Sequence, residues 1–470
     1  MKKQNMLKVI LFTVLAFVVL TWLIPVGTAS GTEVISNGLQ RIGLFELLQN
    51  PIVSFEYFIN VVLFIFGVGA FYGVLSKSEN YSSAVNRISK ALKGKERIAL
   101  IVVAVFFALL TAVCGFNVTA FALIPLFVTV VLSLGYDRMV GFLVTFGATL
   151  MGTIGSVYNY SVTGMLNQYL SLDFGSNLIA KVALLVVPMV VYIFFVDKYA
   201  VSVKKSATRS VLDEGKSDVF ELVEKPKASS TGMFVILGLL ILVLTLAVTP
   251  WNTVFGITVF EDLTEAILSF EVGDHAIFSY LLGAVPAFGN YGYEEVLVLL
   301  LVTSIVVALV SKMNFNDFKE GLALGLKKTI VPAAVVSIAH TVLILSVYYP
   351  IFTTIEGWIL GLVKEFNVFS ILTTSVTAIL GSVFNMDMVY LAQQVTPMVT
   401  AFYEGQNELI ALIFQSMYGL TSLIAPTSIM LILGLEYLDI PYKTWVKFAF
   451  KTILEILVVV LIIVVAMFVI

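Results

Sequence analysis

The amino-acid sequence predicts an all-α polytopic membrane protein made of two inverted-topology repeats, each with a re-entrant hairpin and a broken transmembrane helix. The first observation is composition: 59% of the 470 residues are hydrophobic and 12% are charged, which is about half the charge of a soluble domain. The second is a series of apolar runs of about 20 residues, the length that spans a bilayer as a helix. The third is that two pairs of runs are interrupted near their middles by polar residues, glycine or proline, which are costly in hydrocarbon unless they line a cavity or a site.

Composition also excludes several classes of site. The single cysteine, Cys114, excludes an intrachain disulfide and a cysteine-built metal cluster. Two histidines, His275 and His340, are too few to build a histidine zinc site, and we expect no metal site and no catalytic residue. The apolar core of the N-terminal segment is longer than that of a signal peptide, so we expect it to be the first membrane helix.

The first half, residues 1–196, begins on the cytoplasmic side, because Lys2, Lys3 and Lys8 flank the first apolar run. A further cluster of lysine and arginine at 76–97 marks the next cytoplasmic segment. Outside the interrupted region, we expect helices at 7–26, 55–75 and 178–196. Three glycines of the second helix permit close helix packing: Gly67, Gly69 and Gly73.

The first interrupted pair covers 97–138 and 139–166. In the former, a polar break at 115–119 separates two apolar halves, and the segment is either two crossings or a re-entrant hairpin with its tip at Asn117. In the latter, Gly147, Gly152 and Gly155 weaken the middle of an over-long helix. We therefore expect a helix that is unwound over 152–159.

A hydrophilic, lysine-rich segment at 197–231 is expected to be a cytoplasmic linker. The second half, 232–470, opens with a helix and then an external segment, 251–295, that has no lysine or arginine. We expect interfacial helices in that external segment and an amphipathic surface helix over 351–366. The remaining expected elements are helices at 233–250, 296–310 and 329–349, a hairpin at 368–402 broken at 382–387, a helix at 409–438 broken at 420–428, and a last crossing at 448–470.

The order of elements is the same in the two halves, but charge counting places the base of the first hairpin inside and that of the second outside. Inverted repeats with discontinuous helices near the bilayer midplane are typical of secondary transporters, because broken helix ends offer N–H groups to an anion and carbonyls to a cation. A channel or an intramembrane enzyme is the alternative. An enzyme of that kind needs paired acids or a His/Glu constellation within the membrane, and one central Asp with one His does not supply it.

Several motifs resemble the ion transporter superfamily, and within it the YfcC/DcuC-like C4-dicarboxylate or amino acid carriers. FNVTAFALIPL (116–126) is similar to that superfamily's first hairpin tip, GATLMGTIGSVYN (147–159) to its unwound segment, and GLTSLIAPTS (419–428) to the second-repeat partner. WLIPVG near the N-terminus, LGYDR at 134–138 and the IPYKTWVKF ending at Phe448 support the narrower resemblance. This resemblance implies an elevator-type homodimer that carries a C4-dicarboxylate or an amino acid. The chain departs from the family where an acidic pair near the first tip is replaced by Val118 and Thr119.

The candidate site residues are the polar groups of the two tips and the two breaks. Hydroxyl and amide groups there suit a substrate carboxylate or a cation, and glycine lets the backbone approach a ligand closely. The candidate substrate-binding residues are Asn117, Thr119, Ser156, Asn159, Asn385, Asp387, Thr427 and Ser428. The candidate cation-binding residues, for Na⁺, are Gly152, Thr153, Gly155, Thr421 and Ser422.

Asp387 is the one carboxylate that we place near the membrane centre. It is expected to pair with a substrate ammonium, bind a coupling cation or carry a proton, unless it only caps the second half of its hairpin. No lysine or arginine falls in either break, which favours an amino acid over a dicarboxylate. His340 is expected to be a packing residue, with a proton relay as the alternative.

The function expected from these residues is secondary active transport of a small carboxylate-bearing metabolite, by symport with Na⁺ or H⁺ or by exchange. We expect a multi-pass protein of the inner (cytoplasmic) membrane with its N-terminus in the cytoplasm. Its partners are expected to be the small-molecule substrate, the lipid bilayer and a second copy of the chain, without nucleic acid. No cofactor is expected other than Na⁺ or H⁺ as the coupling ion.

Overall fold

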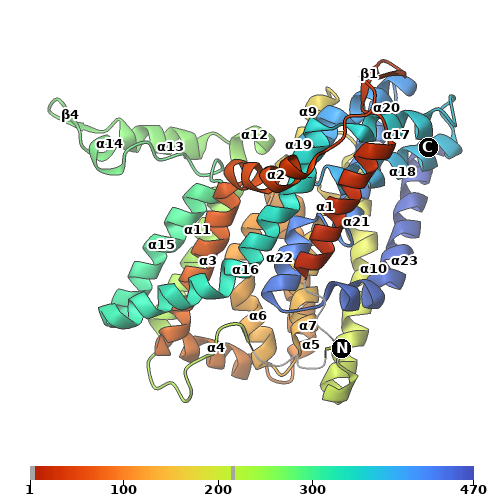
Figure 1. Ribbon diagram of the computed structural model, residues 1–470. Coiled ribbons are helices and arrows are strands. Elements are labelled where there is room, and N and C mark those ends of the chain that lie inside the picture. Colours follow the sequence, from red (N-terminus) through yellow and green to blue (C-terminus); the bar gives the residue numbers. More distant parts are fainter. Residues whose placement is uncertain (1–5, 213–217, 470) are drawn as a thin grey trace.

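The computed structural model describes residues 6–212 and 218–469, and almost all of its regular structure is helical (Figure 1). The first half contains α1 (Met6–Leu23), α2 (Leu44–Tyr57), α3 (Ile59–Lys77), α4 (Glu79–Leu92), α5 (Glu96–Cys114), η1 (Val118–Ala122), α6 (Ile124–Ser133), α7 (Arg138–Phe142), η2 (Leu143–Gly147), α8 (Ala148–Gly155), η3 (Tyr160–Gly164), α9 (Met165–Tyr169) and α10 (Leu178–Lys205). Two short antiparallel hairpins, β1 (Gly27–Ser30) with β2 (Glu33–Ser36) and β3 (Glu271–Val272) with β4 (His275–Ala276), correct the all-α prediction.

The second half follows a short 3-10 turn, η4 (Ala207–Arg209). It contains α11 (Thr231–Val248), α12 (Trp251–Phe255), α13 (Val259–Leu268), α14 (Ile277–Leu282), α15 (Tyr293–Val310), α16 (Phe315–Tyr348), α17 (Ile351–Leu360), α18 (Val368–Phe384), α19 (Met388–Gln394), α20 (Thr396–Phe402), α21 (Asn407–Ser422), α22 (Ile429–Tyr437) and α23 (Tyr442–Val469). Within the described part of the chain, nine helical segments are long and apolar enough to cross a membrane.

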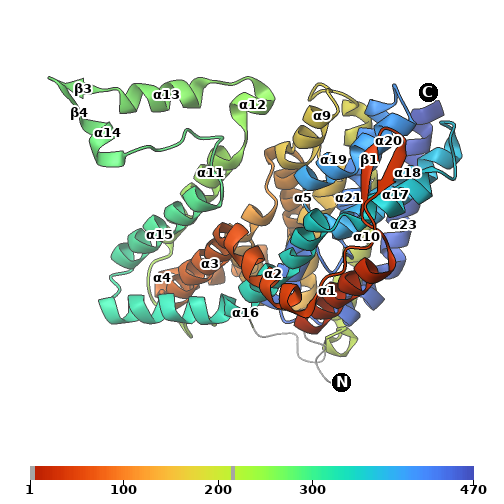
Figure 2. The same ribbon diagram turned by 45° about the horizontal axis from the view of Figure 1, so that its top comes forward.

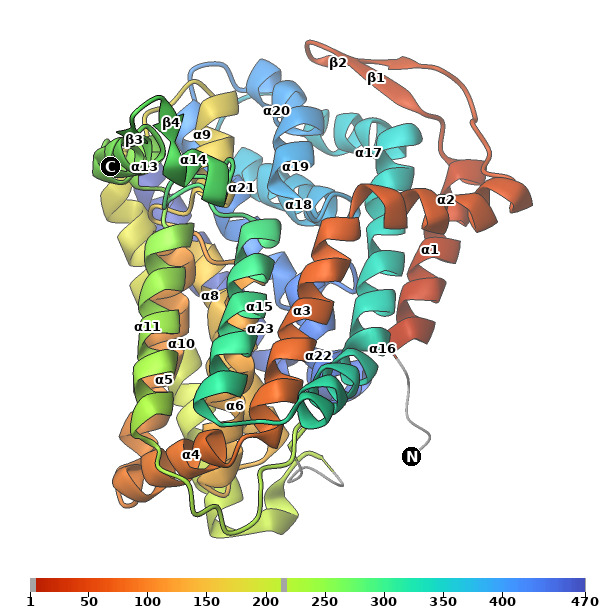
Figure 3. The same ribbon diagram turned by 90° about the vertical axis from the view of Figure 1, so that its left-hand side faces the viewer.

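The helices form two groups that lie side by side (Figures 1 and 3). We call α3, α4, α11, α15 and α16 the frame, because these helices pack mainly on one another. We call α5–α10 and α18–α23 the core group, in which α8 packs against α5, α10 and α21, and α18 against α21. Helix α16 has Pro332 inside it and also touches α22, so it joins the two groups.

The closest contact in the frame is the crossing of α3 and α16, which is made by glycines. A Cβ added at Gly73 would lie 2.1 Å from the carbonyl oxygen of Gly321, and one added at Gly325 would lie 2.0 Å from that of Gly69. No side chain fits at such separations, so the two backbones are in direct contact. The expectation of close packing at the α3 glycines is confirmed.

An arm made of α12, α13, α14 and the β3–β4 hairpin projects from the frame (Figure 2). Its base, α12, contacts η3 of the core group, and the part from α13 to α14 extends away from the rest of the molecule. It begins after α11 and returns to α15 through an extended segment. We call the end of the molecule that carries it the arm end, and the end that carries α4 the linker end. In Figure 1 the first hairpin, α5 with η1 and α6, lies toward the linker end, and the second, α18 with α19 and α20, lies toward the arm end.

The breaks are shorter than predicted. Helix α8 stays helical through Gly155, so only 156–159 is unwound, and α21 stays helical through Ser422, so the second break is 423–428. The second tip is likewise confined to 385–387, because α18 continues to Phe384. Backbone hydrogen bonds, such as that from the Ser156 N–H to the Gly152 carbonyl (3.0 Å), continue each helix into its polar stretch. They form because buried backbone groups need hydrogen-bond partners.

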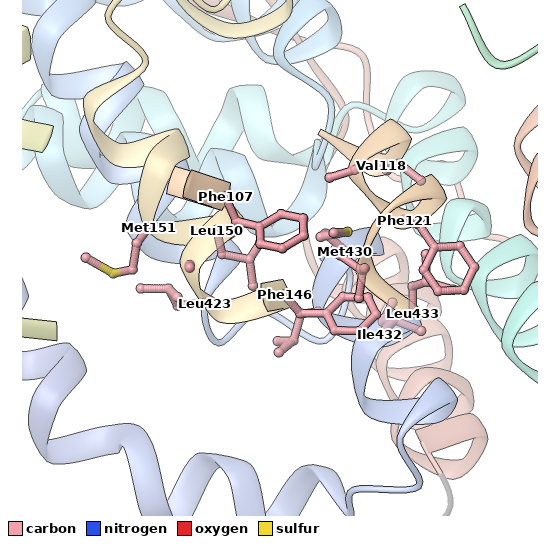
Figure 4. Packing of buried hydrophobic residues seen from close by; sticks show 14 of the residues in the cluster. Phe107, Val118, Phe121, Phe146, Leu150, Met151, Leu423, Met430, Ile432 and Leu433 are labelled. Atoms are coloured by element: carbon pink, nitrogen blue, oxygen red, sulfur yellow. The ribbon is translucent and has the colours of Figure 1, made fainter. Parts of the chain in front are cut away.

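The first hairpin and the second broken helix are held together by aromatic and aliphatic side chains (Figure 4). Phe121 of η1 packs edge-to-face on Tyr437 of α22, with ring centroids 5.1 Å apart, and lies 6.0 Å from Phe146 of η2. Edge-to-face aromatic pairs of this kind add stability beyond their buried area. The packing fixes the tip of the first hairpin relative to α22.

Three further differences from the sequence prediction concern element boundaries. Helix α10 continues to Lys205, nine residues into the segment predicted as linker, and α16 begins at Phe315 rather than 329. The predicted surface helix at 351–366 is wrong: α17 ends at Leu360, and most of its length, including Glu356, is buried. With only ten residues, α17 is too short for the spacing of its apolar residues to tell a surface helix from a buried one.

Candidate functional site

Both hairpin tips and both broken helices line one cavity of about 580 Å³, between the core group and the frame. The tips contribute Asn117, Val118 and Thr119 from the first hairpin and Met386, Asp387 and Met388 from the second. The broken helices contribute Thr149, Leu150, Thr153, Tyr160, Ser161, Tyr418, Ser422, Ser428, Ile429 and Met430. The side facing the frame is formed by Val61, Val248, Pro250, Thr253, the segment 289–293 and His340. Cavities of this size suit a small metabolite.

The first tip is closed by a network of amides and hydroxyls. Asn117 donates from Nδ2 to the Ser161 hydroxyl (2.5 Å), and Ser161 donates to Oδ1 of Asn159 (2.9 Å). The Asn159 amide in turn donates to the Thr111 carbonyl (2.9 Å) and to Oδ1 of Asn117 (3.2 Å). Asn159 is fully buried. Its role is to give the Thr111 carbonyl near the end of α5 a hydrogen-bond donor and to orient Asn117 toward the cavity.

Two glycines at the end of α8, just before the first break, lie where helices cross. A Cβ at Gly152 would lie 2.4 Å from the Ala108 carbonyl oxygen, and one at Gly155 would lie 2.4 Å from Leu185. Ser156 has a left-handed backbone, with φ of 36°, and its buried hydroxyl donates to the Thr153 carbonyl (2.6 Å). These three residues lie outside the cavity lining, and the glycines allow α8 to approach α5 and α10.

The second tip carries a carboxylate that has two roles. Asp387 lines the cavity and is also the N-cap of α19, because Oδ1 accepts from the backbone N–H of Val389 (2.9 Å) and Tyr390 (3.3 Å). Both capping bonds go to the same oxygen. A carboxylate that caps a helix with one oxygen keeps the charge and lone pairs of the other for a ligand.

Asn385, on the same tip, points away from the cavity. It accepts from the Ser346 hydroxyl at Oδ1 (2.9 Å), and it is fully buried with no partner for Nδ2 within the described structure. It therefore ties the tip to α16 of the frame. Thr427 donates to the Val383 carbonyl (2.8 Å) at a separate small hollow beside His340.

At the second break, carbonyls that follow α21 have side-chain donors, whereas the start of α22 has no side-chain cap. The carbonyls of Leu423 and Ile424, beyond the end of α21, accept from Trp445 Nε1 (2.8 Å) and the Tyr442 hydroxyl (2.6 Å) of α23. By contrast, Ser428 is the N-cap of α22 but makes no side-chain capping bond. The first N–H groups of a helix have no intrahelical partner, and those of Ile429 and Met430 belong to residues that line the cavity.

The structure thus brings together part of the predicted site. The predicted residues that line the cavity are Asn117, Thr119, Thr153, Asp387, Ser422 and Ser428. Those that lie outside the lining are Gly152, Gly155, Ser156, Asn159, Asn385, Thr421 and Thr427. Thr421 is buried, and its hydroxyl has no hydrogen-bond partner among the described residues.

Several other lining residues were not predicted as part of the site. Ser161 lies just past the first break, and Tyr418 lies one turn before the second. His340 of α16 is stacked on Phe58, with ring centroids 3.9 Å apart, and its Nδ1 is 3.0 Å from the Val336 carbonyl oxygen. Its ring therefore packs on Phe58, and it also faces the cavity. Tyr293 lines the cavity from the start of α15. The frame residues lie far from the breaks in sequence, and only folding brings them to the cavity.

The charge on the described side chains that line the cavity is of one sign, which is negative. Among the described residues that line it, Asp387 is the one carboxylate, and none is lysine or arginine. Aromatic hydroxyls of Tyr160, Tyr291, Tyr293 and Tyr418 provide neutral polar groups. This arrangement suits a ligand with a cationic group, which an electronegative cavity attracts.

The family model for the C4-dicarboxylate anaerobic carrier, DcuC, matches residues 4–469. The "Putative basic amino acid antiporter YfcC" of Escherichia coli is 23% identical over 446 residues, covering 88% of this chain and 79% of that protein. An uncharacterized protein of Haemophilus influenzae is 30% identical over 117 residues, which are 25% of this chain and 23% of that protein.

Two solved structures are also similar. The YdaH transporter of Alcanivorax borkumensis has 15% sequence identity and a TM-score of 0.40, with 98% of this chain and 97% of that chain covered. MtrF of Neisseria gonorrhoeae, of a class of antimetabolite efflux pumps, has 13% identity and a TM-score of 0.40, with 98% of this chain and 95% of that chain covered.

Proposed function

The chain belongs to the C4-dicarboxylate anaerobic carrier family, a family of multi-pass membrane transporters, and from this premise we propose that it is a secondary active transporter of a cationic or zwitterionic amino acid. The observation that carries the choice of substrate is Asp387, a carboxylate in a cavity whose described lining has no lysine or arginine. A buried dicarboxylate would add two like charges beside it, whereas an ammonium group would neutralise it.

The proposed binding mode uses both ends of an amino acid. The ammonium group, or a cationic side chain, lies against Asp387 at the second tip. The carboxylate lies at the start of α22, where Ser428 makes no side-chain capping bond and the residues that carry the first backbone N–H groups, Ile429 and Met430, line the cavity. A helix amino terminus attracts a carboxylate through these N–H groups and the helix dipole. Asn117 and Thr119 of the first tip complete the polar wall.

We further propose that the two interrupted regions are inverted repeats, the first with 97–138 as its hairpin and 139–166 as its broken helix, the second with 368–402 and 409–438. The linker, 197–231, joins the two halves on the cytoplasmic side. In support of this proposal, the two tips line one cavity, and their hairpins lie toward opposite ends of the molecule in Figure 1. Broken helices around a shared site are the arrangement through which alternating access is achieved in such folds.

The proposed transport mechanism is an elevator movement in which the core group carries the cavity past the frame. The cavity lies between these two groups, so a shift of one along the other would change the side to which it opens. Asn385 supports this arrangement as a contact that must break, because its bond to Ser346 joins the second tip to α16. Movements of packed helix groups of this kind occur on the microsecond to millisecond scale.

The remaining features of the proposal concern placement and assembly. We propose that the protein lies in the cytoplasmic membrane with its N-terminus and linker inside, because the lysine-rich segments follow the positive-inside rule. It works as a homodimer, and its transport is coupled to Na⁺ or H⁺ or occurs by exchange. Thr153 and Ser422, which face the cavity, are the candidates for contact with a cation there.

A C4-dicarboxylate is the second candidate substrate, and the family assignment favours it. In that case the uncapped start of α22 would bind one carboxylate, and a coupling cation or a proton on Asp387 would offset the second. The two candidates differ in whether Asp387 acts as a charge partner of the substrate or must itself be neutralised before the substrate binds.

The experiment is uptake and exchange in proteoliposomes with labelled arginine, aspartate and succinate, each with and without a Na⁺ or proton gradient. We expect arginine or another cationic amino acid to enter fastest, with protein-free liposomes as the control. Uptake of succinate without any amino acid would replace the first candidate with the second. If no member of a broad metabolite panel is moved or exchanged, the transport proposal is wrong.

A further inference from the structure

A second buried carboxylate lies outside the cavity, on α17. Glu356 has no exposed surface, and neither of its carboxylate oxygens has a hydrogen-bond partner within the described residues. It is absent from the residues that line the cavity, so the proposed substrate site does not use it. A buried acid without partners is unusual enough to need an explanation.

The described elements that pack most on α17 offer Glu356 no positive charge. Helix α17 packs against α18, α20 and the β1–β2 hairpin, and these elements contain one ionisable side chain among them, the exposed Glu33 of β2. On α17 itself Glu356 is the one ionisable residue. An ionised carboxylate in this place would therefore be neither paired nor solvated, which is strongly unfavourable.

Contacts of two glycines fix how α17 lies on the second hairpin. A Cβ at Gly381 of α18 would meet the Phe352 ring at 3.2 Å, and one at Gly357 would meet the sulfur of Met398 in α20 at 3.8 Å. Since the start of α17 meets the end of α18, the two helices run in opposite directions. Glu356, one turn after Phe352, is then level with the turn of α18 that precedes Gly381.

That part of α18 carries two threonine hydroxyls that, like the Glu356 carboxylate, are buried and lack a hydrogen-bond partner among the described residues. Thr374 and Thr377 are fully buried, and neither hydroxyl has a hydrogen-bond partner in the described structure. Thr377 lies one turn before Gly381, and Thr374 is about one turn further back on the same face of the helix. Three unsatisfied polar side chains thus fall on the contact between α17 and the second hairpin.

A buried carboxylate is neutralised by a metal ion or by a proton. Metal ions held by oxygen take several ligands, but this contact supplies one carboxylate and two hydroxyls, and the described residues contain no cluster of three acidic, histidine or cysteine side chains. A proton needs one carboxylate oxygen, and the resulting acid O–H can be donated to a threonine hydroxyl.

We propose that Glu356 is the proton-binding site through which transport is coupled to the proton gradient, an inference that rests on the proposed transport function. When a proton binds a carboxylate oxygen, the neutral acid packs between α17 and α18. When the proton is released to water, the carboxylate becomes charged and the contact between α17 and the second hairpin is weakened. The same hairpin carries Asp387 at its tip, so the state of Glu356 acts on the substrate cavity through one rigid unit.

The test is Glu356→Gln, which keeps the shape of the protonated acid but cannot release a proton. Wild-type protein in proteoliposomes should accumulate substrate when a pH gradient is applied. The variant should exchange substrate at a rate within about twofold of wild type, because Asp387 and the helix ends are unchanged, but it should lose accumulation driven by the pH gradient. Glu33→Gln, on the exposed neighbour, is the matched control and should behave as wild type.

Two outcomes would overturn the proposal: accumulation by the Gln variant that equals wild type, or wild-type accumulation that follows a Na⁺ gradient and ignores the pH gradient. If the Gln variant does not fold, Glu356→Asp replaces it. That variant keeps a titratable group, so it should retain driven accumulation with a shifted pH dependence, and an unchanged pH dependence counts against the proposal.

A measurement without substrate separates this proposal from the transport function. The melting temperature of the wild-type protein in detergent should fall as the pH rises from roughly 6 to 9, because the buried site accepts only the neutral acid. The Gln variant should lose that part of the pH dependence, whether or not any substrate is moved. Parallel curves for wild type and variant would show that Glu356 does not titrate in this range.

Discussion

The two hairpin tips face one cavity, but they offer it different chemistry. The first tip is closed on itself, because Asn117, Ser161 and Asn159 bond to one another and to the end of α5. The second tip ends in Asp387, which caps its own helix with one oxygen, and the start of α22, where Ser428 makes no side-chain capping bond, lines the same cavity. The first tip therefore supplies a fixed hydrogen-bonded shape to the cavity, whereas the second tip supplies its negative charge. We infer that substrate choice depends mainly on the second half.

The largest expected effect comes from removing the charge at the second tip. Asp387→Asn should lower transport at low substrate concentration by about 30-fold or more, since losing a buried charge partner costs about 2–5 kcal/mol. Folding should be retained, because asparagine is as good an N-cap as aspartate. Uptake in proteoliposomes measures the loss, and melting temperature measures folding.

Asp387→Ala separates charge from capping. It should lose transport to the same extent and also lose about 1 kcal/mol of stability with the cap. If Asp387→Asn transports like wild type, Asp387 acts only as a cap, and the contrast between the two tips is wrong.

The next effect tests the first tip as a structural unit. Asn159→Ala should lower the free energy of unfolding by about 2–4 kcal/mol, because it leaves the buried Thr111 carbonyl and the Asn117 oxygen without donors. The matched variant in the other half, Asn385→Ala, should cost less, since Asn385 makes one bond, to Ser346. Thermal or denaturant unfolding in detergent compares the two, and a larger cost at Asn385 would reverse the assignment of roles.

A smaller effect is expected at the end of α21. Tyr442→Phe removes the donor to the Ile424 carbonyl (2.6 Å) and should cost about 1 kcal/mol of stability. For comparison in the first half, Tyr192→Phe removes the donor to the Leu143 carbonyl (2.8 Å) at the start of η2. Similar melting temperatures for the two variants would show that backbone support is alike in both halves and that the asymmetry is confined to the tips.

The smallest effect concerns the surface beside α17. Hydrogen bonds from the Gly43 backbone N–H and the Tyr349 hydroxyl lower the pKa of Glu46, and burial, with the same bond, raises the pKa of Tyr349 to about 12. A lowered carboxyl pKa stabilises the fold at a pH above the ordinary value of 4.5 and ceases to do so as the pH falls through the lowered pKa.

The corresponding variant is Glu46→Gln. Wild-type protein should show a fall in melting temperature between roughly pH 5 and 3 that this variant lacks. The two proteins should differ at neutral pH and converge in acid. A constant difference at every pH would mean that the Glu46 carboxylate makes no titrating contribution to the link between α2 and Tyr349.

Much of the fold could be predicted from the sequence because the breaks have local causes. Glycine at 152 and 155 and the proline-containing stretch at 419–428 interrupt apolar runs, and the structure has unwound segments beside or within them, at 156–159 and 423–428. Their lengths were overestimated, because glycine weakens a helix but does not end it when packing supports it. Gly152 and Gly155 stay helical and lie at crossings with α5 and α10.

The cavity could be predicted only in part, because its far side comes from distant elements. Tyr291, Tyr293 and His340 reach it from the frame; nothing in the local sequence marks the two tyrosines, and the position of His340 within an apolar helix does not show that it faces the cavity. Glu356 was missed for a similar reason: in the sequence it is an ordinary acid on a short amphipathic helix. Its burial depends on α18, α20 and the β1–β2 hairpin, which no local pattern relates to α17.

The glycine crossing of α3 and α16 has a consequence for where motion can occur. An added methyl group at Gly73 or Gly325 would overlap a neighbouring backbone atom, so the two helices are in direct backbone contact at this crossing. We expect α3 and α16 to keep this contact when the substrate binds. If the core group moves as proposed, we expect α3 and α16 to stay together and the backbone to bend at short non-helical links, such as 349–350 between α16 and α17.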